Sequence, residues 1–482
     1  MEGPEIKAVE AVIDNGSFGK RTLRFETGRL AQQADGAVAA YLDDDSMILS
    51  TTTAGSSPKE NYDFFPLTVD FNEKMYAAGR IPGGYLKREG RPSEKATLTA
   101  RMIDRPIRPS FPDGFRNEVH IVATSLVADQ VNPFDVINVM GASLAMTLGG
   151  VPFEGPLACV RIGRNVETGE FIVNPTYEER ENSDLDLELG GSADYISMVE
   201  AGAEEISEDD MLAAMKFGQE ALAAFCQAQD EFVAEWEQVN GAIVKKEYPL
   251  DQPVEEVQER IFAHYDEMAA ALRDADKLSR IGKVEALKES IRAEFTEEEQ
   301  AAWEREIPVA LKKLEKKAMR TMVVETGERV DGRAADEIRP IMVKDNYLPL
   351  VHGSGLFQRG QTQVLSVLSL GMLNEGQRLD TIEPTEGKRY MHHYNFPPFC
   401  TGETGRMGSP KRREIGHGNL AERALLPVLP DENEFPYAIR VVSEVMDVQR
   451  LLFDWLRPAA PRSPLWTAAC PLSARSPVSP WV

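Results

Sequence analysis

An internal duplication constrains the fold of this chain more than any other feature. Three short segments recur in the same order at nearly constant spacing, which favours two copies of one structural unit. The matching pairs are Leu30-Ala31-Gln32 and Val38 with Leu356-Phe357-Gln358 and Val364 (offset 326), Leu98 and Arg101 with Leu420 and Arg423 (offset 322), and Ile121-Val122-Ala123 with Val441-Val442-Ser443 (offset 320).

The first copy mixes strands and helices, and a helical insert separates it from the second. From apolar spacing we expect strands over 37–42, 47–52 and 119–126, and helices over 134–148 and 208–240. Gly218 falls on the apolar face of the longer helix, where it would admit a close neighbour. From about 245 to 320, Glu, Lys, Ala and Arg dominate and apolar residues recur at helical spacing, so we expect an all-helical region.

The second copy is expected to be incomplete. The first copy continues far beyond Ala123, whereas only residues 444–482 follow Ser443. From Trp455 onward the chain has six prolines, three tryptophans and no acidic residue. Such a segment is either a disordered tail or the product of a frameshift. We favour a frameshift, because residues 465–471 can be encoded so that a shifted frame reads Leu-Met-Asp-Gly-Gly-Val-Pro, similar to Leu148-Gly149-Gly150-Val151-Pro152.

Composition excludes some classes of protein. A net charge of −25 argues against a protein that coats nucleic acid indiscriminately, although an acidic exterior can surround a basic channel. No apolar run reaches the ~18 residues of a membrane-spanning helix, and the N-terminus does not resemble a secretory leader. Four cysteines lie without metal-ligand or disulfide spacing, so we expect a cytoplasmic protein.

The segment 77–92 is the first candidate for binding chemistry. It combines glycines, which let the backbone approach a ligand, with Lys87 and Arg88, which can pair with phosphates. Tyr85 offers a ring on which a nucleic-acid base can stack. The alternative is an ordinary surface loop with incidental charge.

The second candidate is the segment 408–420, where Lys411, Arg412 and Arg413 precede a histidine, His417, framed by glycines. Three adjacent cations suit a phosphate or a nucleic-acid backbone, although such triplets are also common on solvated surfaces. Arg101, Arg105 and Arg108 lie close to Asp104, so a structural ion-pair network is at least as plausible for them as phosphate contact.

His392 and His393 are adjacent and could suggest a metal site. Neighbouring side chains on a strand point to opposite faces, and no nearby Cys or pair of acids completes a ligand set. We therefore expect a structural role for both.

Several motifs together are specific enough to carry a resemblance. They are Gly79-Arg80-Ile81-Pro82-Gly83, Arg88-Glu89-Gly90-Arg91-Pro92-Ser93, Ile103-Asp104-Arg105-Pro106-Ile107-Arg108-Pro109, His393-Tyr394-Asn395-Phe396-Pro397-Pro398, Gly402-Glu403-Thr404-Gly405 and the segment 408–418. The chain resembles bacterial polyribonucleotide phosphorylases from about residue 5 to 446.

This resemblance implies an α+β fold with two RNase PH-like domains, the second incomplete, joined by an all-helical domain. The expected segments are a first RNase PH-like domain (1–240), a helical domain (241–325), a partial second RNase PH-like domain (326–446) and an aberrant, disordered tail (447–482). Family members form homotrimers whose central channel admits single-stranded RNA.

The resemblance also implies roles for individual residues. Tyr85 would stack on RNA while Lys87 and Arg88 hold its backbone. Arg412 and Arg413 would contact the RNA end, and His417 would lie next to the phosphate site. The implied reaction is reversible 3′-to-5′ phosphorolysis, in which inorganic phosphate attacks the terminal phosphodiester and releases a nucleoside diphosphate, with Mg²⁺ and arginines offsetting the developing charge.

The chain departs from the family after Met446. The serine-rich phosphate loop and the metal-binding aspartates expected there are missing, so no metal ligand is assigned and we expect no phosphorolysis from the chain as written. One alternative is a non-catalytic RNA-binding or scaffold subunit of an RNA-degrading assembly. Another is a sequence artefact of an intact enzyme, which the nucleotide sequence encoding 440–482 would decide.

Overall fold

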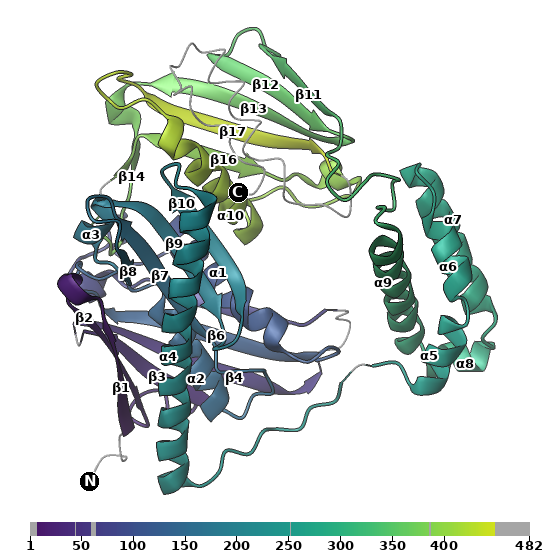
Figure 1. Ribbon diagram of the computed structural model, residues 1–482, viewed down its shortest axis with the longest axis horizontal. Coiled ribbons are helices and arrows are strands. Elements are labelled where there is room, and N and C mark those ends of the chain that lie inside the picture. Colours follow the sequence, from purple (N-terminus) through teal and green to yellow (C-terminus); the bar gives the residue numbers. More distant parts are fainter. Residues whose placement is uncertain (1–6, 44, 59–63, 251, 385–386, 449–482) are drawn as a thin grey trace.

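The computed structural model describes residues 7–43, 45–58, 64–250, 252–384 and 387–448. Three bodies follow one another along the chain: a first α+β unit, a group of helices to one side, and a second, smaller α+β unit that packs on the first (Figure 1). None of the helices in the described ranges is long and apolar enough to cross a bilayer. Most of the predicted tail, 449–482, lies outside the described residues.

Two sheets and their helices build the first unit. The first sheet has the order β1 (Lys7–Asp14), β2 (Lys20–Thr27), β3 (Gly36–Leu42), β4 (Ser46–Pro58), β6 (Asn117–Val127) and β5 (Leu67–Asn72). The second sheet has the order β10 (Ile196–Ala203), β9 (Ser183–Gly191), β7 (Ala158–Asn165) and β8 (Phe171–Val173). Along β6, side chains alternate between buried and more exposed positions, as a half-buried strand requires.

Three helices of the first unit complete its core. Helix α2 (Ile137–Leu148) is buried along most of its length and contacts strands of both sheets. Helix α1 (Glu94–Ile107) begins at Ser93, whose side chain accepts a hydrogen bond from Ala96 N. Helix α4 (Glu208–Asn240) has the predicted bounds. A Cβ on Gly218 would collide with the Leu189 side chain of β9, so the expected close neighbour is present.

The predicted all-helical region is confirmed. It contains α5 (Glu255–Phe262), α6 (Tyr265–Leu272), α7 (Lys277–Ala293), α8 (Glu297–Ala302) and α9 (Glu306–Thr326). These helices bury a core of their own, separate from that of the first unit. The preceding residues are extended and lie against the first unit, where Lys246 N donates to Gly150 O at 2.9 Å.

The second unit repeats the first sheet. Its strands have the order β11 (Ile341–Asp345), β12 (Gly353–Arg359), β13 (Thr362–Gly371), β17 (Ala438–Asp447) and β16 (Tyr390–Asn395). As β5 pairs with β6, so β16 pairs in parallel with β17, and helix α10 (Arg412–Leu425) packs on β16 as α1 packs on β5. The mixed sheet with the same strand order in both units confirms the duplication.

The structure corrects two of the three residue matches on which the duplication was predicted. The match between β6 and β17 is right, because Ala123 lies opposite Ser50 and Ser443 lies opposite Ser366. Leu30, however, lies in a bend before β3, whereas Leu356 lies within β12. Those short matches arose by chance, since common residues recur without structural register.

The helix match was also shifted by one turn. Helices α1 and α10 begin at Glu94 and Arg412 and end at Ile107 and Leu425, an offset of 318 at both ends. Arg105, and not Arg101, therefore corresponds to Arg423.

Candidate functional site

The segment 77–92 forms a loop with a free tip. Tyr85 is 98% exposed and Leu86 82% exposed, while Lys87 and Arg88 are also exposed. Lys87 has a left-handed backbone with φ of 51°, and its N–H donates to Gly84 O at 3.0 Å. The loop thus turns tightly between Gly84 and Lys87 and presents an aromatic ring and two cations to solvent.

The base of this loop contacts the second unit. Arg91 hydrogen-bonds through Nη1 to Ser409 Oγ, and Ser409 belongs to the basic segment 408–420. The two segments that the sequence singled out are therefore neighbours, although more than three hundred residues separate them. We call this shared surface of loop 77–92 and the start of α10 the inter-unit face.

Helix α10 positions the predicted residues of the second unit. Glu414, in its first turn, accepts hydrogen bonds from Lys411 N at 2.7 Å and from Phe396 N at 2.9 Å. This carboxylate fixes the start of the helix to the end of β16. Lys411, Arg412 and Arg413 gather positive charge at a helix N-terminus, where the helix dipole also favours an anion.

The two arginines of that segment point to different partners. Arg412 binds the carboxylate of Asp70 and the carbonyl of Val69, both on β5 of the first unit. Asp70 in turn lies 3.0 Å from His120 Nε2. Arg413 instead lies over the ring of Phe396, with 5.6 Å between guanidinium and ring centroid.

His417 follows Arg413 by one helical turn and is buried. Its ring meets that of Tyr394 edge to face, with centroids 5.0 Å apart. Tyr394 and Phe396 stack at 6.5 Å. The structure therefore brings Arg413 and His417 together beside these two rings, while Arg412 turns toward the first unit.

The adjacent histidines point to opposite faces of β16, as expected. His392 is buried, lies 2.8 Å from the Tyr390 hydroxyl and 2.9 Å from Ser443 Oγ, and burial together with His393 lowers its pKa to about 3. His393 Nδ1 accepts a hydrogen bond from Arg440 Nε at 3.1 Å. Across the described ranges, no group of three or more His, Cys, Asp or Glu lies close enough together to hold a metal ion.

Of the three candidate arginines Arg101, Arg105 and Arg108, structural ion pairs account for two. Arg108 binds Asp104 at 2.6 Å, and Arg105 binds Glu200. Arg101 lies against Gly416 of α10, where a Cβ would collide with its guanidinium. Gly416 is thus required for the close approach of α1 and α10.

Asp70 and Glu414 take part in these contacts and were not singled out from the sequence. The same is true of residues 380–383 of the second unit, where Thr381 O accepts a hydrogen bond from Arg80 Nη1 of loop 77–92 at 3.0 Å. Asp70 could have been found, because residues 67–72 alternate apolar and polar side chains and predict a strand with Asp70 facing outward. The segment 380–383 carries no comparable pattern.

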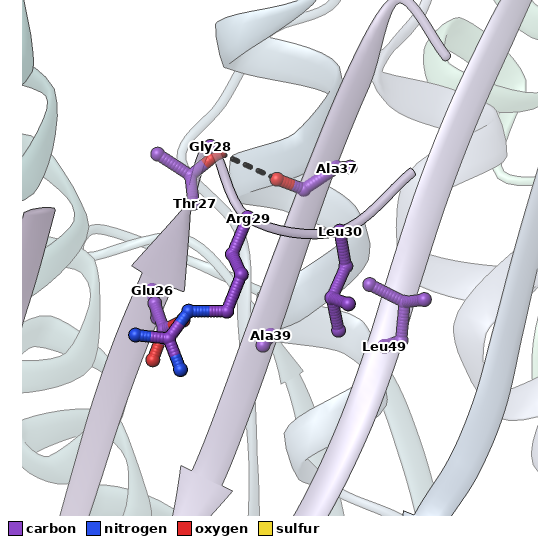
Figure 2. Close-up of a pocket in the computed structure, with 8 residues that line it drawn as sticks. All are labelled: Glu26, Thr27, Gly28, Arg29, Leu30, Ala37, Ala39 and Leu49. Atoms are coloured by element: carbon purple, nitrogen blue, oxygen red, sulfur yellow. Dashed lines mark hydrogen bonds and ion pairs between the residues drawn. The ribbon is translucent and has the colours of Figure 1, made fainter. Parts of the chain in front are cut away.

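A small pocket on the first sheet lies apart from the inter-unit face. It holds about 170 Å³ of empty space, part of it open to solvent. Its two charged side chains pair with each other, since Arg29 Nε lies 3.1 Å from Glu26 Oε1 (Figure 2). The lining residues are Glu26, Thr27, Gly28, Arg29, Leu30, Ala37, Ala39 and Leu49, none of which was predicted as a site residue.

Family models match most of the chain. The model of the 3′ exoribonuclease family, domain 1, matches twice, at 19–152 and 337–470, which is more than half of the chain. Its second match continues past Met446, where the resemblance was expected to end. The model of domain 2 of that family matches 155–221, and a polyribonucleotide nucleotidyltransferase RNA binding domain matches 255–334.

Curated relatives agree with the family models. Polyribonucleotide nucleotidyltransferase of Bifidobacterium longum (strain DJO10A) is 50% identical over 477 residues, covering 92% of this chain and 51% of the relative. The protein of the same name from Heliobacterium modesticaldum is 49% identical over 432 residues, covering 89% of this chain and 59% of the relative. The chain thus spans about half the length of the curated relatives it matches.

A solved structure is also similar in part. The crystal structure of rice (Oryza sativa) Rrp46 covers 48% of this chain and 94% of its own, with 10% identity and a TM-score of 0.33. A score this low supports no argument about function.

Proposed function

The chain belongs to the 3′ exoribonuclease family, and from this membership we propose that it carries the RNA-guiding part of a 3′-to-5′ phosphorolytic exoribonuclease. The observation that carries the proposal is the inter-unit face. Arg91 and Ser409 join an exposed aromatic and basic loop to the cationic start of α10. RNA that stacks on the loop could therefore reach the cations of the second unit.

Loop 77–92 suits single-stranded RNA. Tyr85 exposes both its ring faces, and stacking on a base tolerates any sequence. Lys87 and Arg88 are exposed and form no ion pair with the described part of the chain. The Lys87 ammonium donates to Gly83 O at 3.4 Å, a long and exposed contact that a phosphate can replace. Leu86 adds apolar surface, which leaves base stacking to Tyr85.

Helix α9 offers a second basic surface. Lys312, Lys316 and Arg320 are exposed on the side of the helix opposite its buried residues. Lys313 and Lys317 flank this side, and Lys317 Nζ lies 5.1 Å from the ring centroid of Phe262. Over the same stretch the one acid is Glu315, which pairs with Lys288 at 2.9 Å. In a chain of net charge −25 such a segregated face is an electrostatic footprint for phosphates. We propose that it adds backbone contacts with RNA, as the name of the matching family model suggests.

The start of α10 is proposed to hold the reacting end of the RNA. Arg412 and Arg413 would pair with phosphate oxygens, and His417 would lie beside the inorganic phosphate. In the complete reaction a phosphate oxygen attacks the phosphorus of the terminal phosphodiester. The bond to the 3′-oxygen of the preceding nucleotide breaks, and the terminal nucleotide leaves as a nucleoside diphosphate.

For the 482-residue chain itself we propose RNA binding without phosphorolysis. Residues 447–482 contain no serine-rich loop of the kind expected to bind phosphate. Mg²⁺ is the proposed cofactor of the complete reaction, although no group of three or more His, Cys, Asp or Glu that could hold a metal ion is found among the described residues. A homotrimer in the cytoplasm is the proposed setting, and a non-catalytic scaffold subunit is the alternative with the same RNA contacts.

Two measurements test the proposal. Fluorescence anisotropy with a labelled oligo(A) should show binding that weakens about tenfold when Lys87 and Arg88 are replaced by Ala, because two phosphate contacts are lost. Lys216→Ala/Lys245→Ala is the matched control, since it removes the same charge from exposed positions elsewhere. If the control loses as much affinity as the loop variant, the loop is not the binding surface.

The second measurement is release of nucleoside diphosphates from poly(A) in the presence of phosphate and Mg²⁺. We expect none above background from this chain. Turnover would contradict the proposed inactivity and would show that this chain carries out phosphorolysis. RNA binding without turnover agrees with both the proposal and the scaffold alternative.

A further inference from the structure

A short segment of the second unit holds the base of the proposed RNA loop. Residues 380–383 lie between β14 (Gln377–Arg378) and β15 (Gly387–Lys388), and we call them the strap. In Figure 1 the chain beyond β14 runs down toward α3 (Tyr177–Glu181) of the first unit. The strap belongs to the second unit by sequence but packs on the first.

The strap is firmly anchored. Ile382 is 1% exposed and joins the hydrophobic core of the first unit. Its N–H donates to Glu73 Oε1 at 3.0 Å. Glu383 receives Lys95 at 2.9 Å and the Tyr177 hydroxyl at 3.1 Å. A buried side chain and three charge-assisted contacts fix the strap in place.

The anchored strap then contacts the loop at two points. Asp380 Oδ2 accepts a hydrogen bond from Gly83 N at 2.7 Å. Arg80 Nη1 donates to Thr381 O at 3.0 Å. Gly83 immediately precedes the turn from Gly84 to Lys87, which forms the tip of the loop. Holding the N–H of Gly83 therefore fixes the direction in which this tip projects.

We propose that Asp380 is a positioning residue for the RNA loop: its carboxylate holds Gly83 so that Tyr85, Lys87 and Arg88 project together toward RNA. This inference rests on the proposed function of the loop. Asp380 does not contact RNA itself. It fixes a flexible, glycine-rich segment before RNA arrives, which lowers the entropy that binding must otherwise remove.

Charge and positioning predict opposite signs for the loss of this carboxylate. If Asp380 acted only through its negative charge, Asp380→Ala would strengthen the binding of a polyanion. If it positions the loop, Asp380→Ala weakens binding by about fivefold, the size of one hydrogen bond. Asp380→Asn keeps an acceptor oxygen for Gly83 N and should retain most of the affinity.

The matched control is Asp431→Ala. Asp431 is also an exposed acid that accepts a hydrogen bond from a backbone N–H, that of Asn433 at 2.7 Å, but it lies in a different turn of the second unit. It removes the same charge without touching the loop. We expect it to leave oligo(A) affinity unchanged or slightly higher.

Gly83 supplies a second, independent way to break the contact. A Cβ at this position would lie 2.8 Å from Asp380 Oδ2, so Gly83→Ala must push the carboxylate away. Gly83→Ala and Asp380→Ala should each weaken oligo(A) binding. Because both break the same contact, the double variant should bind no more weakly than the single variant with the lower affinity. Trypsin should cleave after Lys87 or Arg88 faster in both, while the melting temperature stays that of the wild type.

The outcomes separate this inference from the proposed function. Additive losses in the double variant, or an Asp380→Ala variant that binds like Asp431→Ala, would overturn the positioning role. If Lys87→Ala/Arg88→Ala still weakens binding in that case, the proposed function stands without it. If the wild-type chain and the Lys87→Ala/Arg88→Ala variant bind oligo(A) equally, the proposed function fails first.

Discussion

The two α+β units share one strand order, yet equivalent positions meet opposite surroundings. Leu23 and Phe25 of β2 are buried, and the Phe25 ring meets Phe232 of α4 with centroids 6.3 Å apart. By strand register their counterparts on β11 are Ile341 and Val343, which are 55% and 53% exposed. In the first unit, β1 pairs with β2 and α4 packs against it. The same apolar positions are therefore buried on β2 and exposed on β11.

The interiors of the two sheets also differ. In the second unit a row of hydrogen bonds crosses three strands, from Ser366 through Ser443 (2.9 Å) and His392 (2.9 Å) to Tyr390 (2.8 Å). This row separates two small hydrophobic clusters. The positions equivalent to Ser443, His392 and Tyr390 in the first unit are Ala123, Val69 and Leu67, within one continuous core. Duplication has therefore kept the topology and exchanged the means of stabilisation.

The largest expected effect lies at the covered strand. Phe25→Ala should lower the free energy of unfolding by about 3–5 kcal/mol, because it removes a fully buried ring. Val343→Ala, at the equivalent exposed position on β11, should lower it by less than about 1 kcal/mol. Urea denaturation of both variants checks the pair. Similar losses would mean that something covers β11 in solution and that the contrast is not real.

The next effect concerns two equivalent arginines that share one acid. Arg423 binds Glu200 at 2.9 Å and Asp186 at 3.3 Å with a side chain that is 16% exposed, whereas Arg105, also on Glu200, is 35% exposed. Arg423→Ala, which breaks the more buried pair, should lower the free energy of unfolding by about 3 kcal/mol. Arg105→Ala, which breaks the more exposed pair, should lower it by about 1 kcal/mol or less.

Arg423→Ala and Arg105→Ala, compared by urea denaturation, measure this difference. Arg423 comes from α10 of the second unit, so its loss should also loosen the packing of α10 on the first unit. Hydrogen exchange in 412–425 should rise in Arg423→Ala and stay unchanged in Arg105→Ala. A larger loss for Arg105→Ala would reverse the assignment of the buried partner.

The sequence was sufficient to predict elements but not their contacts across the chain. Apolar spacing predicted α4 with its observed bounds, and the basic composition of 77–92 and 408–420 singled out two segments whose cations at 87–88 and 411–413 are exposed. It could not predict that Arg412 meets Asp70, because that contact depends on how two units pack. The strap was missed for the same reason: its residues have meaning only against Glu73, Lys95 and Gly83.

A pH-dependent effect distinguishes the polar row of the second unit. Burial and the neighbouring His393 lower the pKa of His392 to about 3 in the folded chain, against about 6.5 unfolded. Its contribution to stability is therefore complete above about pH 6.5 and falls by about 1.4 kcal/mol per pH unit between pH 6.5 and 3. Val69, its counterpart in the first unit, does not titrate.

His392→Val tests this by introducing the residue of the first unit. We expect the variant to be less stable than the wild type at pH 7.5, because Ser443 and Tyr390 lose a buried partner, by about 1–3 kcal/mol. The gap between variant and wild type should narrow as the pH falls from 6.5 to 5, in urea melts at each pH. A constant gap would show that His392 protonates without penalty and is less buried than the structure has it.

The smallest expected effect compares two serines at equivalent positions. Ser50 and Ser366 are both buried in the middle of β4 and β13, but Ser50 Oγ has no hydrogen-bond partner within the described ranges, whereas Ser366 Oγ lies 2.9 Å from Ser443 Oγ. Ser50→Ala removes an unsatisfied hydroxyl and should leave the chain equally stable or up to about 1 kcal/mol more stable. Ser366→Ala should cost about 1 kcal/mol, because it leaves Ser443 with one partner fewer. Opposite signs at one position of a repeated fold, measured by urea denaturation, would show that the polar row stabilises the second unit. Stability changes of the same sign in both variants would show that the polar row does not stabilise the second unit and is a sequence difference that the fold tolerates.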